Sequence, residues 1–233
     1  MSEDIKMLTD IESLSGSLAQ RVYQSLREAI LAMVYPPGSV LKKNVICEQL
    51  GVSRSPVAEA IARLAAEGLV DVIPQSATRV SCFSMEEIRE ASFLREALEC
   101  AAVETVAMQR SDEQLAKLTR NVRLQEMLVE DRDYAEFYKA DEEFHGLIME
   151  FTGFPGVSSV AATVSLQLKR VRMLLLPEEG RPAETIKEHR AILDAIRDQD
   201  PAAAQAAMKA HLRMLIPRLL PLEKEHAEYF RSR

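Results

Sequence analysis

Residues 50–70 read LGVSRSPVAEAIARLAAEGLV, and this stretch constrains the fold more than any other part of the chain. Gly51 follows a short helical pattern and can end it in the left-handed conformation that favours glycine. Ser53 is a residue type that caps helix N-termini, and Pro56 is tolerated in a first helical turn. The apolar residues that follow recur every three or four positions, as on one buried helix face. The stretch therefore predicts two helices joined by a tight turn.

The sequence on either side of this turn predicts a small winged domain. An apolar stripe begins at Leu18 and stops at YPPG, where proline and glycine break a helix. After Gly68, the segment LVDVIPQSATRVSCF holds two short β-rich stretches around a turn, which is typical of a hairpin. Residues 18–82 are therefore expected to form a winged helix-turn-helix.

A helix-turn-helix suggests a DNA-binding surface, because the N-terminal residues of its second helix reach base edges in the major groove. Arg54 can pair with a guanine or a phosphate, and Ser55 can hold a phosphate. Residues 18–80 carry seven basic and five acidic side chains, a local charge of +2, although the whole chain carries −7. This change of sign favours DNA binding over a structural turn with a solvated face. The predicted contacts are Lys42, Lys43, Asn44, Ser53, Arg54, Ser55, Pro56, Arg63, Thr78 and Arg79.

The remainder of the chain predicts helices only, so the fold class is mainly α. Residues 1–17 are expected as a flexible polar tail, and residues 83–233 as an all-helical domain. Pro217 and Pro221 should kink or split the last helix, because proline lacks the amide N–H that a helix interior needs. A break is expected at PEEGRP, near residue 180. The six expected helices span about 85–109, 112–130, 133–151, 155–175, 182–199 and 201–229.

Three of the four histidines, His145, His189 and His211, fall on apolar faces of these helices. Asp141 lies four residues before His145, so the two side chains project from one helix face, one turn apart. A single histidine in such a place usually just packs, but a buried carboxylate is costly unless it is paired or binds a metal. Together the four residues suit a divalent transition metal, with zinc favoured and nickel or manganese as alternatives. His226 lies among charged residues and is expected at the surface.

Arg95 is a candidate for binding an acid beside that metal. It lies among Phe93, Leu94 and Leu98 and is therefore expected to point partly inward, where a guanidinium can hold a carboxylate through two hydrogen bonds. The alternative, given equal weight, is an ion pair within the helix between Arg95 and Glu99, four residues on.

The composition places the protein in a reducing, aqueous compartment. No apolar run is long enough to span a bilayer, and the acidic start MSEDIKMLTD is unlike a secretory signal. The three cysteines, Cys47, Cys82 and Cys100, lack metal-motif spacing and are expected as free thiols. A cytoplasmic protein without membrane association is therefore expected.

Residues 18–82 resemble the GntR family of bacterial transcription regulators. The resemblance lies in VYQSLREAILAMVYPPGSVL, LGVSRSPVAEAIARLAAEGLV and the wing IPQSATRV. Ala58 stands where the family usually has an arginine, and Ser76 and Ala77 replace the usual Arg-Gly of the wing tip. Because both positions normally touch DNA, the operator sequence cannot be inferred from the resemblance.

Residues 85–229 resemble the FCD effector-binding domain of FadR-type members of this family. DEEFH matches the Asp-x-x-x-His motif of that domain, and EHRAIL and AHLRM match its second and third histidine segments. Six helices without an extra one resemble the VanR-like subgroup. The resemblance implies that Arg95, in the first helix of the domain, lines the effector pocket.

The combined expectation is a bacterial transcription regulator, most simply a repressor, rather than an enzyme. A single winged helix-turn-helix buries too little DNA-groove surface for tight binding, so a homodimer on an inverted-repeat operator is expected. A small organic acid at the metal would pull on the helix that carries Arg95 and so move the DNA-binding domain. A metal-dependent hydrolase is the first alternative, but it needs a general base beside the metal, and Glu142 and Glu143 leave their helix in other directions than Asp141. The second alternative is a metal-free binding module whose histidines only pack.

Overall fold

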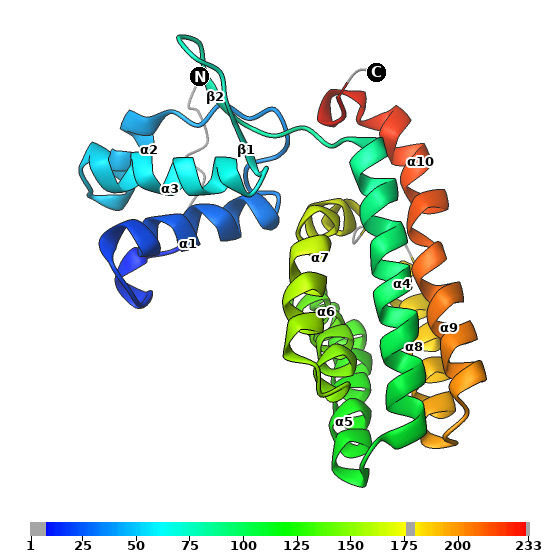
Figure 1. Cartoon of the computed structure of the whole chain (residues 1–233). Helices are drawn as coiled ribbons and strands as arrows, with labels where there is room; N and C mark the ends of the chain where they lie inside the picture. Colours follow the sequence, from blue (N-terminus) through cyan, green and yellow to red (C-terminus); the bar gives the residue numbers. More distant parts are fainter. Residues whose placement is uncertain (1–7, 176–179, 232–233) are drawn as a thin grey trace. The chain divides into compact units, whose positions relative to one another are not determined.

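The computed structural model describes residues 8–175 and 180–231. Residues 1–7 of the predicted tail and residues 177–179 of the predicted break at PEEGRP lie outside the described residues. The described part confirms a mainly helical chain, with a winged helix-turn-helix followed by an all-helical domain (Figure 1).

The winged domain contains three helices and a two-stranded antiparallel sheet. The turn between the second and third helices is set by Gly51, whose φ of 64° is the left-handed conformation predicted for it. Ser53 is the residue before the third helix, but its side chain makes no capping hydrogen bond. In the sheet, Val70 lies opposite Val80. The elements are α1 (Leu18–Leu31), α2 (Lys43–Leu50), α3 (Arg54–Ala66), β1 (Val70–Val72) and β2 (Thr78–Val80).

The described residues before α1 are packed, so the prediction of a flexible tail is wrong for them. A short 3₁₀ helix, η1 (Ile11–Ser13), places the side chain of Ile11 in a buried position. The Ser25 hydroxyl donates to the carbonyl oxygen of Thr9 at 2.9 Å, and Arg21 donates to the carbonyl oxygen of Ile11 at 3.2 Å. One apolar side chain and two backbone acceptors are enough to hold this polar segment against α1.

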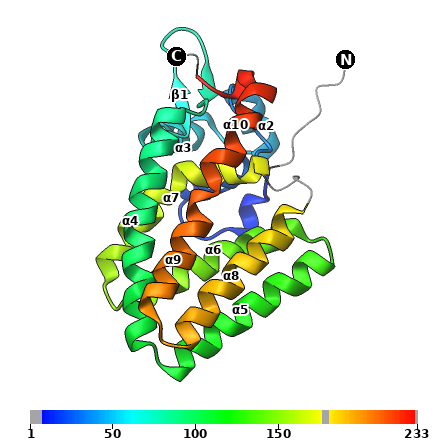
Figure 2. The ribbon, with the colours of Figure 1, turned by 90° about the vertical axis from the view of Figure 1, so that its right-hand side faces the viewer.

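The all-helical domain contains seven helices in the described residues, because the last predicted helix is split. α9 ends at Arg213, and α10 begins two residues before Pro217. The ring of a proline clashes with the carbonyl group four residues earlier, which here belongs to Arg213. α8 lies between α5 and α9 (Figure 2). The helices are α4 (Met85–Gln109), α5 (Asp112–Glu130), α6 (Tyr134–Phe151), α7 (Pro155–Leu175), α8 (Arg181–Arg197), α9 (Pro201–Arg213) and α10 (Leu215–Glu225).

A continuous apolar core holds these helices together. Its fully buried members include Val106 of α4, Phe144 and Ile148 of α6, Ile196 of α8 and Met208 of α9. Full burial of each such side chain contributes roughly 1.5–3 kcal/mol. The core fixes the faces of α6, α8 and α9 that carry the three predicted histidines.

The division of the chain into two compact units differs from the prediction at the C-terminus. One unit is Glu86–Pro221, and the other is Met1–Met85 together with Leu222–Arg233. The predicted boundary at residues 82 and 83 lies close to the first junction. The last residues, however, belong with the DNA-binding unit rather than with the bundle, because Phe230 packs against Phe83 with ring centroids 5.3 Å apart.

Candidate metal centre and DNA-binding surface

The structure brings His145, His189 and His211 together from α6, α8 and α9. All three are buried, and ring nitrogens, one from each residue, lie within 4.8 Å of one another. The Nε2 atoms of His145 and His211 are 3.3 Å apart. Three imidazoles that meet at one buried point form a set of nitrogen ligands suited to zinc, copper, iron or nickel.

Each of the three imidazoles is oriented through its Nδ1 atom. His145 Nδ1 lies 2.6 Å from Glu99, His211 Nδ1 lies 2.6 Å from Glu188, and His189 Nδ1 lies 2.8 Å from Gln125 Oε1. Carboxylate and amide oxygens only accept hydrogen bonds, so each Nδ1 donates, and in a neutral ring Nε2 then keeps its lone pair. This arrangement is the one that metal-binding histidines usually have.

The electrostatics of the cluster favour the neutral forms of His189 and His211 and the charged form of Glu188. Burial lowers the pKa of His211 to about 4 and, with the neighbouring His211 and His145, lowers the pKa of His189 well below its usual value. Hydrogen bonds from His211 and Arg181 outweigh burial and lower the pKa of Glu188 to about 2. Both histidines can therefore act as metal ligands at neutral pH.

Asp141, the fourth predicted ligand, lies at the edge of the cluster. Its Oδ1 atom is 3.6 Å from His189 Nε2, while its Oδ2 atom accepts a hydrogen bond from Arg172 of α7. The sequence prediction did not identify Arg172. Asp141 thus has one oxygen turned to the histidines and one held by a guanidinium.

The donor set fits a divalent transition metal. His189 Nε2 is buried and has no hydrogen-bond partner among the described residues. A buried polar atom left without a partner costs roughly 1–3 kcal/mol, and a metal ion at the centre of the cluster would satisfy it. Three imidazole nitrogens and one carboxylate oxygen are donors that Zn²⁺ accepts.

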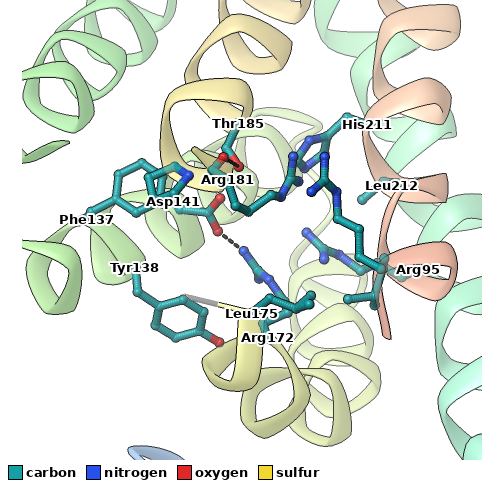
Figure 3. A pocket seen from close by; sticks show the side chains of 13 residues that line it. Arg95, Phe137, Tyr138, Asp141, Arg172, Leu175, Arg181, Thr185, His211 and Leu212 are labelled. Atoms are coloured by element: carbon teal, nitrogen blue, oxygen red, sulfur yellow. Dashed lines mark hydrogen bonds and ion pairs between the residues drawn. The ribbon is translucent and has the colours of Figure 1, made fainter. Parts of the chain in front are cut away.

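Two adjoining cavities open beside the cluster, and both are lined by Arg95 and Arg172. One, of about 60 Å³, is also lined by Arg181, Arg218 and His211. Figure 3 shows the guanidinium groups of Arg95, Arg172 and Arg181 directed into the same space. The other cavity, of about 200 Å³, lies between α4, α6 and α7. The site therefore offers several guanidinium groups to a ligand.

Each of these arginines already has a carboxylate partner. The ion pair predicted as the alternative for Arg95 is present, because its Nε atom lies 2.6 Å from Glu99 Oε1. Arg95 also lines both cavities, and its role as a carboxylate clamp stays a prediction. Arg181 pairs with Glu188 at 2.9 Å, and Arg218 pairs with Glu184. Ion pairing holds the guanidinium groups in place before any ligand arrives.

Glu142 and Glu143, the neighbours of Asp141, both have partners. Glu142 pairs with Lys169 at 2.7 Å and lines the larger cavity beside the cluster. Glu143 accepts from Asn121 at 2.9 Å.

Two of the ten predicted DNA contacts are buried, and the other eight are exposed. Among the ten, the side chain of Arg63 lies over the ring of Tyr23 at 3.7 Å, and Arg79 donates to the carbonyl oxygen of Gly38 at 3.0 Å. Burial of Pro56 and Thr78 argues against direct contact by these two. The exposed residues at the starts of α2 and α3 are Lys42, Lys43, Asn44, Ser53, Arg54 and Ser55.

Sequence comparisons agree with this architecture, which is that of a transcription regulator. Residues 18–80 match the family model described as "Bacterial regulatory proteins, gntR family", and residues 90–214 match the model described as "FCD domain". The chain belongs to the GntR family and is a DNA-binding transcriptional regulator with an FCD domain.

Individual relatives span nearly the whole chain. An uncharacterised HTH-type regulator in an unstable DNA locus of Streptomyces ambofaciens is 33% identical over 209 residues, 90% of this chain and 88% of the relative. The repressor RspR of Escherichia coli K12 is 28% identical over 211 residues, 91% of this chain and 92% of RspR. The solved structure of E. coli McbR/YncC has a TM-score of 0.76 at 21% identity, and it covers 89% of this chain and 99% of that one.

None of the helices in the described residues has both the length and the apolarity that a membrane span needs.

Proposed function

We propose that this regulator is a homodimeric, cytoplasmic repressor whose affinity for an inverted-repeat operator is controlled by a small organic acid. The acid binds at a metal site formed by Asp141, His145, His189 and His211. The single observation that carries the proposal is the convergence of three buried imidazole nitrogens beside cavities lined by arginine. Placement in the VanR-like subgroup is part of the proposal and counts α9 and α10 as one helix divided near Pro217.

The metal part of the proposal rests on the donor set. Zn²⁺ is the first choice, with Ni²⁺ or Mn²⁺ as alternatives, because three imidazoles and one carboxylate accommodate each of them. When bound, the ion would supply a positive centre for a carboxylate. The chain contributes the rest: Glu99, Glu188 and Gln125 orient the imidazoles, and Arg172 holds Asp141.

The effector is proposed to be a small anion, on grounds of charge and volume. The larger cavity, of about 200 Å³, is smaller than the roughly 300–1,000 Å³ typical of pockets for drug-sized ligands. Arg95 and Arg172 line both cavities, and guanidinium groups bind carboxylates with two parallel hydrogen bonds. A compact carboxylic acid meets both conditions.

The DNA part rests on the exposed polar residues at the starts of α2 and α3. Arg54 and Ser55 lie at the N-terminus of α3, where a helix-turn-helix reads base edges. A two-fold protein binds a two-fold site, so the operator is proposed to be an inverted repeat. The name of the relative RspR, a transcriptional repressor, supports repression. We propose no enzymatic role, since Glu142 and Glu143 are held by Lys169 and Asn121.

The test is a measurement of operator affinity in the presence of candidate acids. DNA selected from a random pool by the purified protein serves as operator, and binding is followed by fluorescence anisotropy. Each acid is compared with its own uncharged amide, which has the same shape without the charge. A typical allosteric coupling of about 1–3 kcal/mol would change affinity roughly 5- to 150-fold. If no acid acts differently from its amide, the proposed control by an anion is wrong.

A further inference from the structure

Two buried amides of α5 form a line of hydrogen bonds that ends at His189. The Nδ2 atom of Asn121 donates to the carbonyl oxygen of Ala140 at 3.0 Å and to Glu143 at 2.9 Å. The Nε2 atom of Gln125 donates to Asn121 Oδ1 at 2.7 Å. The Oε1 atom of Gln125 lies 2.8 Å from His189 Nδ1. Asn121, Gln125 and His189 are all buried.

The direction of every bond in this line is fixed from one end. The carbonyl oxygen of Ala140 and the carboxylate of Glu143 only accept, so the NH₂ group of Asn121 must face them. Its Oδ1 atom then faces Gln125, which must offer its own NH₂ group. That leaves Gln125 Oε1 toward His189, and His189 must donate through Nδ1.

We propose that Asn121 and Gln125 are positioning residues that set the tautomer of His189 and thereby aim its Nε2 lone pair at the histidine cluster. The inference deepens the proposed metal site and rests on it. The cluster is already surrounded by the carboxylates of Glu99, Asp141 and Glu188, each with an arginine partner. A fourth buried carboxylate would need another cation. A neutral amide supplies the acceptor without that charge.

The first test needs no metal. Nitrogen-15 NMR of the histidine rings distinguishes the two neutral tautomers, and the chain has only four histidines. The inference predicts the Nδ1–H form for His189 in the wild type, and mainly the Nε2–H form or a mixture in Gln125→Leu. Finding the Nε2–H form in the wild type would overturn it, whether or not the variant folds.

The second test is Zn²⁺ affinity, measured by competition with a chelator. Loss of an outer partner of a metal-bound histidine typically weakens binding roughly 10- to 100-fold, and Gln125→Leu should do so. Gln205→Leu is the matched control, because Gln205 hydrogen-bonds Glu104 on the exposed surface. Equal affinities for the two variants would overturn the inference. A wild type with the predicted tautomer that binds no Zn²⁺ would instead refute the proposed metal site and leave the tautomer assignment standing.

A separate set of contacts concerns the C-terminal segment, residues 226–231. The amide of Phe83 donates to the carbonyl oxygen of Tyr229 at 2.8 Å, and the amide of Arg231 donates back to Phe83 at 2.8 Å. Phe83 and Phe230 are both buried, with ring centroids 5.3 Å apart. The C-terminal segment is thus paired with the residues that directly follow β2.

The chain therefore passes between the two compact units twice. The first crossing, at residues 85 and 86, lies at the start of α4, and the second, at residues 221 and 222, lies within α10. α10 carries Arg218, and α9 carries His211, both of which line the smaller cavity. Two covalent crossings restrict the movement of one unit against the other more than a single linker would.

From these contacts we infer that the C-terminal segment is a second mechanical link, through which changes at α9 and α10 reach the end of β2. A link through α4 alone would leave this segment without a regulatory role. The Phe83–Phe230 contact is the point at which the second link can be cut. Because Phe230 lies outside the cavities and the DNA-binding helices, a substitution there leaves both binding surfaces intact.

Hydrogen exchange with Zn²⁺ as the probe tests the link. In the full-length protein, Zn²⁺ should slow exchange severalfold in residues 141–148 and also in residues 78–84. In Phe230→Ala the first effect should remain and the second should disappear. Glu228→Ala is the control, because its side chain is exposed in the same segment. A Phe230→Ala protein that responds like the wild type in residues 78–84 would overturn the inference.

A second perturbation keeps the test independent of metal binding. Met208→Ala removes a fully buried side chain from α9 and should loosen that helix. If the link exists, exchange in residues 78–84 is faster in Met208→Ala than in the wild type. In the Phe230→Ala background, adding Met208→Ala should leave exchange in these residues unchanged. Equal changes in both backgrounds would exclude the link. Zn²⁺ that protects neither segment would refute the metal site rather than the link.

Discussion

Removal of the Glu99 carboxylate should destabilise the bundle strongly. Glu99 is buried and accepts from Arg95 Nε at 2.6 Å and from His145 Nδ1 at 2.6 Å. Burial alone would raise the pKa of Glu99, but Arg95 and His145 together outweigh it and hold that pKa well below its usual value, so the group is a charged carboxylate. Glu99→Ala leaves a buried guanidinium and a buried ring N–H without this acceptor.

The magnitude follows from the burial of the pair. Removal of one partner of a buried ion pair typically costs about 3–5 kcal/mol, because the other charge stays in a medium of low polarity. The chain offers a matched exposed pair with the same spacing, Lys117 and Glu113 at 3.2 Å. Helix pairs of that kind contribute only about 0.3–0.5 kcal/mol, so Glu113→Ala should have almost no effect.

Urea unfolding followed by circular dichroism at neutral pH measures both variants. The expected result is a loss of several kcal/mol for Glu99→Ala and less than about 1 kcal/mol for Glu113→Ala. Replacing Arg95 and Glu99 together by leucine should cost less than the sum of the two single changes, since no lone charge then remains buried. Equal losses for Glu99→Ala and Glu113→Ala would refute the assignment of Glu99 as a buried, paired carboxylate.

Three further predictions address DNA, effector and pH. Arg54→Ala should weaken operator binding by about 1–3 kcal/mol if it contacts a base, or lower the salt dependence by about one unit if it contacts a phosphate. Arg63→Ala, whose side chain is held on Tyr23, should change operator affinity little. Arg95→Lys keeps a charge beside Glu99 but loses the planar fork, so it should abolish the response to acid and retain metal, and a full response would refute the clamp. The pKa of Glu96 is lowered by hydrogen bonds from Arg213, so its contribution to stability is present above its unfolded pKa of about 4.3 and lost as pH falls further. Glu96→Gln should flatten the acid limb of a stability–pH profile, and an unchanged limb would contradict the pairing.

Most of the fold could be predicted because helix starts, helix ends and turns depend on residues close together in the sequence. Gly51 and the YPPG segment end helices through glycine and proline, whose effect is confined to a few neighbouring residues. Pro217 ended a helix at Arg213 because the clash spans four residues. Asp141 and His145 could be placed together because they are one turn apart.

The parts that escaped prediction are contacts between distant segments. Gln125 and His189 are 64 residues apart, Glu99 and His145 are 46 apart, and Arg172 and Asp141 are 31 apart. No spacing rule links such pairs, since helix packing alone decides which polar residues meet. The sequence predicts a role for Glu99 only as a partner of Arg95, four residues away. The contact between Phe230 and Phe83 is another pairing of distant segments that no spacing rule predicts.

The burial of predicted DNA contacts also depends on packing. Thr78 is a strand residue, and successive residues of a strand face opposite sides of the sheet. The sequence does not say which side of so short a strand is covered. Arg63 lies on the recognition helix, but near its end, where the ring of Tyr23 and the carboxylate of Glu67 are within reach. Arg63 is exposed, and its contacts with Tyr23 and Glu67 restrict how far it can reach toward DNA.

The most direct test of the account is the metal content of the purified protein. The chain is prepared without a histidine tag and without chelators, and the metal in each sample is determined by elemental analysis. The account predicts about one divalent ion per chain in the wild type and in His226→Ala, and a large loss in His189→Ala. A wild type without metal, or a His189→Ala protein that keeps its full content, would contradict the central claim that Asp141, His145, His189 and His211 form a metal site.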